Sequence, residues 1–185
     1  MPFTFRETGV VDLLVIEPVS FGDDRGVFRE TFKADDFGAV GLPTSFVQSN
    51  LSVSQPGVLR GLHFQTDPMA QGKLVSCSAG SVFDVAVDLR VGSPTYGKWF
   101  GEELSLANGW LLWIPVGFAH GFCVLEGDAV LTYSVTEVYS GANDGGIRWD
   151  DPDIGVDWPI DTPILSVKDQ SLPLLAERNP GFHYV

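Results

Sequence analysis

Apolar residues occur along this chain in short runs, many alternating with polar residues, and glycine or proline separates one run from the next. Such runs predict strands, because a strand alternates its side chains between two faces. They cover residues 10–18, 26–32, 45–54, 57–65, 73–80, 81–90, 99–106, 110–115, 121–126 and 129–139. The only clear helical segment is the short "KADDFGAVG" at 33–41. Many short strands between turns predict an all-β antiparallel sandwich or barrel, with residues 1–185 forming a single domain.

The strand predicted at 57–65, "GVLRGLHFQ", is unusual because an arginine and a histidine interrupt its apolar residues. Strict alternation assigns Arg60 to one face and His63 to the other. A histidine in this setting is a catalytic base, a metal ligand or a hydrogen-bonded core residue. Its position in the strand leaves all three open.

Two further strands carry polar residues in a regular pattern. Alternation places Asp84 and Asp88 on one face of residues 81–90, as expected for a solvated face or for the wall of a wet pocket inside a barrel. In residues 129–139 it places Tyr133 and Tyr139 on the same face. A strand tyrosine is more often part of the core or rim, so these positions suggest chemistry only in combination with others.

Composition narrows the class of protein. A hydrophobic content of 44%, with 5 Trp and 13 Phe, is typical of a globular chain and excludes a disordered one. No apolar run reaches the roughly 20 residues that a membrane span requires, and the N-terminus lacks the basic and apolar regions of a secretory signal. Cys77 and Cys123 lie in strand-like contexts without CxxC spacing. We expect buried free thiols in a cytoplasmic protein.

The charge is strongly acidic, at −13. This balance argues against binding to nucleic acid or to anionic membranes, which favour basic surfaces. A small anionic ligand is still compatible, because it responds to local charge. Four of the 11 Lys and Arg residues, Arg25, Arg60, Lys73 and Lys168, recur in the motifs described below. They suggest an anion pocket within an acidic protein.

The histidines are few and scattered: His63, His120 and His183. A metal-binding cupin usually presents a close histidine pair and a carboxylate, which this sequence lacks, so we expect no metal site. An acid–base set is the alternative. His63 would be its base, with Asp169 or Asp84 orienting the ring, Tyr133 its acid and Lys73 the stabiliser of an oxyanion. On spacing alone His63 is more often structural.

Taken in order, the segments resemble the dTDP-4-dehydrorhamnose 3,5-epimerase family, deoxysugar-nucleotide epimerases of the cupin superfamily. The matching segments are "DDRGVFRETF", "FVQSNLSVS", "GVLRGLHFQ", "QGKLVSCSAGSVFDVAVDLR", "SPTYGKW", "IPVGFAHGF", "TYSVTEVY", "GIRWDDPDIGVDWP" and "LSVKD". The resemblance covers about residues 10 to 170. It implies a metal-free cupin-like jelly-roll, usually a homodimer and without a cofactor, that inverts carbons 3 and 5 of dTDP-4-dehydro-6-deoxy-glucose to give dTDP-4-dehydro-rhamnose.

The resemblance also implies roles for particular residues. His63 would be the base that removes a proton beside the ketone, and Asp169 of the "KD" pair would orient it. Tyr133 would donate a proton on the opposite face, and Lys73 would lie near the keto oxygen. Further positions would contact substrate, with Tyr139 stacking on the thymine ring and Asp144 standing where the family often has Glu. These positions are Arg25, Glu30, Gln48, Ser49, Asn50, Arg60, Lys73, His120, Tyr139, Asp144 and Lys168.

Three rival functions are compatible with parts of this pattern. An epimerase of an antibiotic sugar pathway would act at carbon 3 or carbon 5 alone. A sugar-nucleotide-binding cupin would bind without catalysis, although binding alone does not need His63, Tyr133 and Lys73 together. A metal-dependent cupin oxygenase would need the histidine pair that is missing.

The family reading conflicts with strict alternation at one point. It requires Arg60 and His63 in the same pocket, whereas alternation separates them. Gly61 is where a β-bulge could switch the facing of the strand at no steric cost. We therefore expect a local break at Gly61. The tail after Asp169, "QSLPLLAERNPGFHYV", is expected to be a packed closing segment without chemistry.

Overall fold

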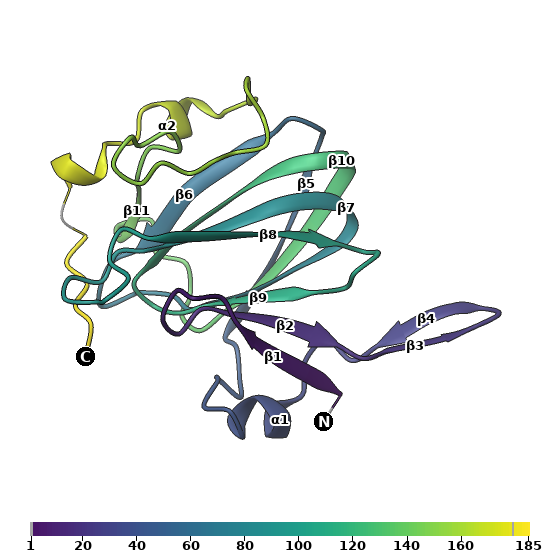
Figure 1. The fold of residues 1–185 in the computed structure, drawn as a ribbon. Coiled ribbons are helices and arrows are strands. Elements are labelled where there is room, and N and C mark those ends of the chain that lie inside the picture. Colours follow the sequence, from purple (N-terminus) through teal and green to yellow (C-terminus); the bar gives the residue numbers. More distant parts are fainter. Residues whose placement is uncertain (1, 179) are drawn as a thin grey trace.

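The computed structural model describes residues 2–178 and 180–185. Its strands form one large antiparallel sheet that curls into two layers, with a small hairpin projecting from one side (Figure 1). The strands are β1 (Phe3–Glu7), β2 (Leu14–Pro18), β3 (Ser20–Asp23), β4 (Gly26–Arg29), β5 (Gln48–Ser54), β6 (Leu59–Gln65), β7 (Lys73–Asp88), β8 (Trp99–Ser105), β9 (Leu111–Ile114), β10 (Phe118–Val135) and β11 (Asp144–Gly146). The helices are α1 (Ala34–Gly38), α2 (Val167–Gln170) and the 3₁₀ turn η1 (Leu175–Glu177).

Two long strands, β7 and β10, hold the layers together. β7 and β10 pair with each other along their length. The strand order of the large sheet is β1-β2-β9-β7-β10-β6-β11, and in addition β8 pairs with β7 and β5 pairs with β10. Near its start β7 pairs with β9, and after Gly80 it pairs with β8. Likewise β10 pairs first with β6 and later with β5. Each long strand therefore passes from one layer to the other, which makes the fold the predicted jelly-roll.

The bend in these strands depends on a glycine. Gly80 has φ +67°, and a Cβ there would lie 2.7 Å from the carbonyl oxygen of Glu126. The register between β7 and β10 shifts beside this contact, between Val124 and Leu131. Each of these strands was predicted as two separate ones, because the turn signals at the bend resemble those of a real turn.

The core lies on both sides of the β7–β10 ribbon. Inside the barrel the side chains of Val82, Leu104, Leu112 and Leu131 belong to one buried cluster. Outside it a second cluster joins the face of β6 and β7 to the C-terminal segment, and a third places α1 against β2 and β9 through Phe37. Both faces of β7 are thus covered, which explains its nearly continuous burial.

The predicted elements agree with the structure in most places and differ in a few. The helix expected at 33–41 is α1. The strand expected at 129–139 ends at Val135, so Tyr139 lies in the following loop. A solvated face for Asp84 and Asp88 is wrong, since both carboxylates are completely buried. Strands β1, β3 and β11 and helix α2 were not predicted; they are 3 to 5 residues long and carry little periodic signal.

The break expected at Gly61 is confirmed. His63 lies opposite His120 and Arg60 lies opposite Phe122, so β6 uses one more residue than β10 between the same two points. Gly61 has φ +138° and its peptide bond to Leu62 is cis. A Cβ at Gly61 would lie 2.5 Å from the Cα of Gly121 on the neighbouring strand. The bulge therefore depends on a close backbone approach that only glycine allows.

In the described part of the chain, the helices are all too short or too polar to cross a membrane.

Candidate active site

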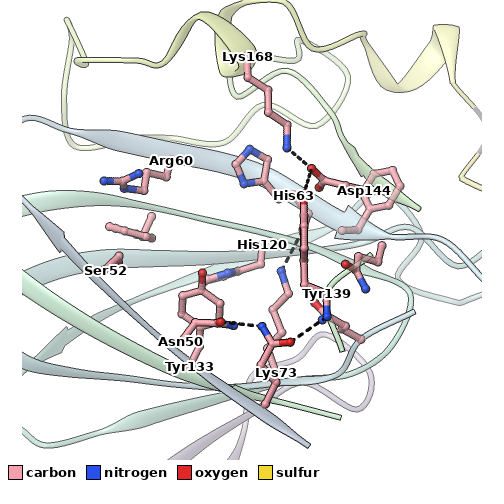
Figure 2. A pocket seen from close by; sticks show the side chains of 15 residues that line it. Asn50, Ser52, Arg60, His63, Lys73, His120, Tyr133, Tyr139, Asp144 and Lys168 are labelled. Atoms are coloured by element: carbon pink, nitrogen blue, oxygen red, sulfur yellow. Dashed lines mark hydrogen bonds and ion pairs between the residues drawn. The ribbon is translucent and has the colours of Figure 1, made fainter. Parts of the chain in front are cut away.

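A cavity of about 310 Å³ opens between the two layers of the barrel. Figure 2 shows polar side chains from several strands directed into it. Its lining comprises Gln48, Asn50, Ser52, Arg60, His63, Phe64, Gln65, Gln71, Lys73, His120, Phe122, Tyr133, Tyr139, Asp144 and Lys168. The bulge in β6 is what allows both Arg60 and His63 to be among them.

A histidine–aspartate pair lies on one wall of this cavity. The His63 Nε2 is 2.5 Å from Oδ1 of Asp169, a buried residue in α2. Burial works against ionisation of Asp169, but the hydrogen bond and charge of His63 outweigh it and lower the pKa of the carboxyl. An ionised Asp169 accepts a hydrogen from Nε2, which leaves Nδ1 as the basic nitrogen of the ring.

The short helix α2 places this aspartate. Its first residue follows Ser166, whose hydroxyl accepts a hydrogen bond from the backbone N–H of Asp169. Such an N-cap fixes the start of the helix and with it the direction of the Asp169 side chain. Of the two carboxylates considered as partners for His63, Asp169 therefore makes the contact. Asp84 contacts His120 instead, with 2.8 Å between Oδ1 and Nε2.

Lys73 stands at the start of β7, on the floor of the same cavity (Figure 2). It is 7% exposed, and its Nζ donates a hydrogen bond of 3.4 Å to the backbone oxygen of His63. Burial lowers the pKa of Lys73 to about 8, against the opposing effect of the negative charges of Asp84 and Asp144. A desolvated ammonium in this position interacts strongly with any anion that forms in the pocket.

Tyr133 reaches the cavity from β10, where it pairs with Asn50 of β5 and Val75 of β7. The tyrosine is half-buried, and burial raises the pKa of its phenol, although the charge of Arg60 lowers it in part. A raised pKa keeps the hydroxyl protonated at neutral pH. Tyr133 is thus able to donate a proton, and it comes from a different strand than His63.

The outer rim combines an aromatic ring with an ion pair. The Lys168 Nζ donates to Oδ2 of Asp144 at 2.5 Å, and the Tyr139 hydroxyl donates to the same oxygen at 3.4 Å. The backbone N–H of Tyr139 donates to Oε1 of Gln48 at 2.9 Å. Tyr139 is 61% exposed, so a flat ligand group has access to its ring.

Three of the expected substrate contacts lie away from this cavity. Ser49 falls on the other face of β5, because its neighbours Gln48 and Asn50 point inward. Arg25 lies at the tip of the β3–β4 hairpin, where its side chain is 90% exposed and paired with Asp23. Glu30 follows the same hairpin. Within this chain, these three side chains therefore do not lie beside the other expected contacts.

The structure also adds residues that the sequence pattern did not single out. Alternation from Gln48 and Asn50 points to Ser52, whose buried hydroxyl has no hydrogen-bond partner among the described residues. Gln65 is held by the backbone at Met69, Val138 and Ser140. Gln71 donates to the backbone oxygen of Glu137. Gln65 ends β6 and Gln71 lies in the loop before β7, and a glutamine gives no distinctive signal in either place, which is why both were missed.

The charges suit an anionic ligand. Arg60, Lys73 and Lys168 all line the cavity although the chain as a whole is at −13. Within the described residues, no group of three or more His, Cys, Asp or Glu side chains is arranged to hold a metal ion. The arrangement can bind an anion, remove a proton with His63 and return one from Tyr133.

Comparison with known proteins gives a consistent result. The family model described as dTDP-4-dehydrorhamnose 3,5-epimerase matches residues 7–177. A Sinorhizobium fredii protein of that name is 51% identical over 183 residues, which is 98% of this chain and 94% of the relative. A crystal structure of dTDP-6-deoxy-D-glucose-3,5-epimerase from Legionella pneumophila, in complex with dTDP-4-keto-L-rhamnose, is 45% identical with a TM-score of 0.93, covering 99% of both chains.

A relative with a narrower name is also similar. A dTDP-4-dehydrorhamnose 3-epimerase from Streptomyces niveus is 44% identical over 178 residues, 95% of this chain and 86% of that protein.

Proposed function

Since this chain belongs to the dTDP-4-dehydrorhamnose 3,5-epimerase family, we propose a mechanism in which its barrel pocket moves two protons by acid–base chemistry. The protein is an isomerase that inverts carbons 3 and 5 of dTDP-4-dehydro-6-deoxy-glucose, giving dTDP-4-dehydro-rhamnose. One observation carries the mechanism: an imidazole on the pocket wall, His63, has an ionised carboxylate hydrogen-bonded behind it. That pairing is the usual arrangement of a general base.

The base acts at a carbon made acidic by the ketone. Removing a proton from carbon 3 or carbon 5 gives an enolate whose charge gathers on the oxygen of carbon 4. His63 takes this proton on Nδ1, while Asp169 stabilises the resulting imidazolium through Nε2. The ammonium of Lys73 lies beside the backbone of His63 and stabilises the oxyanion. Such a cation lowers the free energy of the transition state more than that of the ground state.

Inversion requires a proton from the opposite face of the sugar. Tyr133 supplies it, because burial keeps the phenol protonated and because β10 brings it to the pocket independently of β6. The substrate already carries its ketone, so the reaction requires no redox cofactor. After each inversion His63 releases its proton to solvent and Tyr133 regains one from solvent, so both groups are reset before the second carbon reacts.

The remaining polar groups bind the nucleotide part. Arg60 and Lys168 offset the charge of the diphosphate, and Tyr139 stacks on the thymine ring. Asp144 holds Lys168 through their ion pair and accepts from the Tyr139 hydroxyl. His120, Gln48 and Asn50 complete the substrate contacts. We place the enzyme in the cytoplasm, in line with the two cysteines that are buried and free in the structure.

We further propose a homodimer in which the β3–β4 hairpin reaches the partner's pocket. The hairpin projects from the body of the chain (Figure 1). It exposes Phe21, Val27 and Phe28 by 55%, 60% and 66%, which is costly for a free arm in water. Docking on a second copy would bury them and protect sheet edges. It would also bring Arg25 and Glu30 to a substrate, although their own pocket lacks them.

A mixing experiment tests this arrangement. Arg25→Glu is expected to lower kcat/KM strongly without dissociating the dimer, and His63→Ala is expected to be inactive. If Arg25 acts across the dimer, a mixed dimer of the two variants contains one pocket free of both changes. Activity should therefore reappear when the two are exchanged together, as measured by epimerisation rate. Mixed dimers that remain inactive would show that Arg25 serves its own pocket, and full activity of Arg25→Glu alone would show that it serves none. A monomer in sedimentation would remove the dimer proposal.

The function itself is tested by isotope exchange. Incubation of the protein with dTDP-4-dehydro-6-deoxy-glucose in deuterated water is expected to place deuterium at carbons 3 and 5, read by NMR. Labelling at a single carbon would make the protein a mono-epimerase, the activity that the name of the Streptomyces niveus relative indicates. No labelling, with substrate still bound, would make it a binding protein. Full activity after exhaustive chelation is expected, and its loss would favour a metal-dependent mechanism.

A further inference from the structure

Asp84 is the charged residue of the pocket region whose surroundings the proposed mechanism does not explain. It lies on β7 facing the barrel interior and is completely buried. Its Oδ1 accepts a hydrogen bond from His120, but its Oδ2 has no hydrogen-bond partner among the described residues. A buried carboxylate oxygen without a partner is costly and calls for a reason.

A second carboxylate on the same face of β7 provides a comparison. Asp88 is also completely buried, but it accepts hydrogen bonds from the guanidinium of Arg90 and from the hydroxyls of Ser93 and Thr95. That set satisfies both oxygens, as expected of a structural carboxylate. The incomplete set at Asp84 is therefore a local feature and not a general property of the strand.

The histidine beside Asp84 does not neutralise it. Burial lowers the pKa of His120, against the opposing charge and hydrogen bond of Asp84, so the ring is neutral at physiological pH. Its Nε2 then donates to Asp84, which determines the tautomer and the orientation of the ring. The negative charge of Asp84 remains to be balanced by a cation elsewhere in the pocket.

Lys73 is that cation. The charges that act on its ammonium are Asp84 from β7, Asp144 from β11 and Lys168 from α2, and the backbone oxygen of His63 on β6 accepts its hydrogen bond. His120 on β10 faces the same group but is neutral. Asp144 is already paired with Lys168 at 2.5 Å. In the described part of the chain, Asp84 is thus the negative charge acting on Lys73 that has no cation bonded to it.

We infer, given the proposed function, that Asp84 is a positioning residue: it orients His120 by a hydrogen bond from behind the pocket, and its unpartnered buried oxygen provides a negative charge on the side of the pocket where Lys73 lies. The substrate contacts Lys73 and His120, and Asp84 acts through both. One buried carboxylate then serves the reaction without touching the sugar.

The direction in which Asp84→Asn changes the pKa of Lys73 follows from the loss of the negative charge of Asp84. Burial already lowers the pKa of Lys73 to about 8, and the charge of Asp84 opposes that effect. Asp84→Asn removes the charge and keeps the shape, so the pKa of Lys73 should fall further. The protonated fraction of Lys73 is then lost at a lower pH. Asp84→Asn also removes two effects that raise the pKa of His120, so the titration of His120 moves further below the alkaline limb.

The test is the pH dependence of kcat/KM for deuterium exchange at carbons 3 and 5, between about pH 6 and pH 9, because this ratio reports groups of the free enzyme. In Asp84→Asn we expect the alkaline limb of the kcat/KM profile to shift to lower pH by about one pH unit. The loss relative to wild type should be small at the acidic end and about tenfold larger at the alkaline end. Asp84→Glu, which keeps the charge, should retain the wild-type limb even if its rate is lower.

Asp151→Asn is the matched control, a buried carboxylate away from the pocket that accepts hydrogen bonds from backbone N–H groups. It should change stability without moving the limb. A uniform rate loss in Asp84→Asn, with an unmoved limb, would overturn the inference. If that variant does not fold, Asp84→Ser replaces it, and failure of both would make Asp84 structural. An inactive wild type would instead refute the proposed function.

Discussion

His63→Ala is expected to abolish deuterium incorporation at both carbons, with a fall in kcat of at least about 100-fold to 10,000-fold. The reason is geometric: the His63 imidazole has a carboxylate, Asp169, bonded to its far nitrogen and its side chain is 31% exposed to the pocket. The other paired imidazole, His120, is bonded to Asp84 and is only 8% exposed. Neither Lys73, which is protonated up to about pH 8, nor the protonated phenol of Tyr133 can replace it as a base at neutral pH. The measurement is NMR of the sugar after incubation in deuterated water.

Tyr133→Phe is the matched comparison for this prediction. It removes only the proton donor, so exchange of the sugar protons should continue while conversion to the inverted product falls further than exchange does. A different ratio of exchange to inversion in the two variants would separate the base from the acid. If His63→Ala kept full exchange, the assignment of His63 as the base would be wrong. Binding of the substrate by both variants, measured by calorimetry, excludes simple loss of the pocket.

Lys73→Met is expected to lower kcat by about 100-fold to 1,000-fold while changing KM much less. Methionine has a similar length but no charge, so the pocket keeps its shape and loses the cation that faces the enolate oxygen. An interaction made mainly in the transition state appears in kcat and not in KM. Steady-state kinetics on the coupled conversion of the sugar nucleotide measure both constants.

The same substitution has an opposite effect on folding. Lys73 is 7% exposed, and the burial of its ammonium is unfavourable enough to bring its pKa down to about 8. Replacing it with an apolar side chain removes this cost, so the melting temperature of Lys73→Met should be unchanged or higher. A variant that lost activity only because it unfolded at lower temperature would contradict the role of Lys73 in catalysis. Lys98→Met, outside the pocket, is the control for charge removal.

The alternation of polar and apolar residues was sufficient to predict a barrel of antiparallel strands and the inward face of residues 129–135. It could not show that β7 and β10 continue through their bends, because Gly80 gives the same local signal as a turn. It also could not distinguish a buried acidic face from a solvated one. Asp84 and Asp88 look alike in the sequence, and their different partners follow only from the packing of β10 and of the loop after β7.

The candidate site was predicted mainly from the order of motifs and not from periodicity. His63 and Asp169 are far apart in the chain, and only the docking of α2 brings their atoms to 2.5 Å. A helix of 4 residues has no periodic pattern that a sequence could reveal. Arg25 and Glu30 were predicted as contacts for this pocket, yet they lie outside it, because a sequence does not show the direction in which the β3–β4 hairpin projects.

The extra residue in β6 also has a use in comparing sequences. Arg60 and His63 are three positions apart, an odd spacing that alternation alone would divide between pocket and exterior. The odd spacing and the glycine at position 61 must therefore be considered together, because the spacing places both side chains in the pocket only where the glycine allows the bulge. A related chain that keeps the arginine and the histidine at this spacing but carries a side chain in place of the glycine should have lost one of the two from its pocket. Such a chain can be set apart from active epimerases by inspecting four consecutive letters.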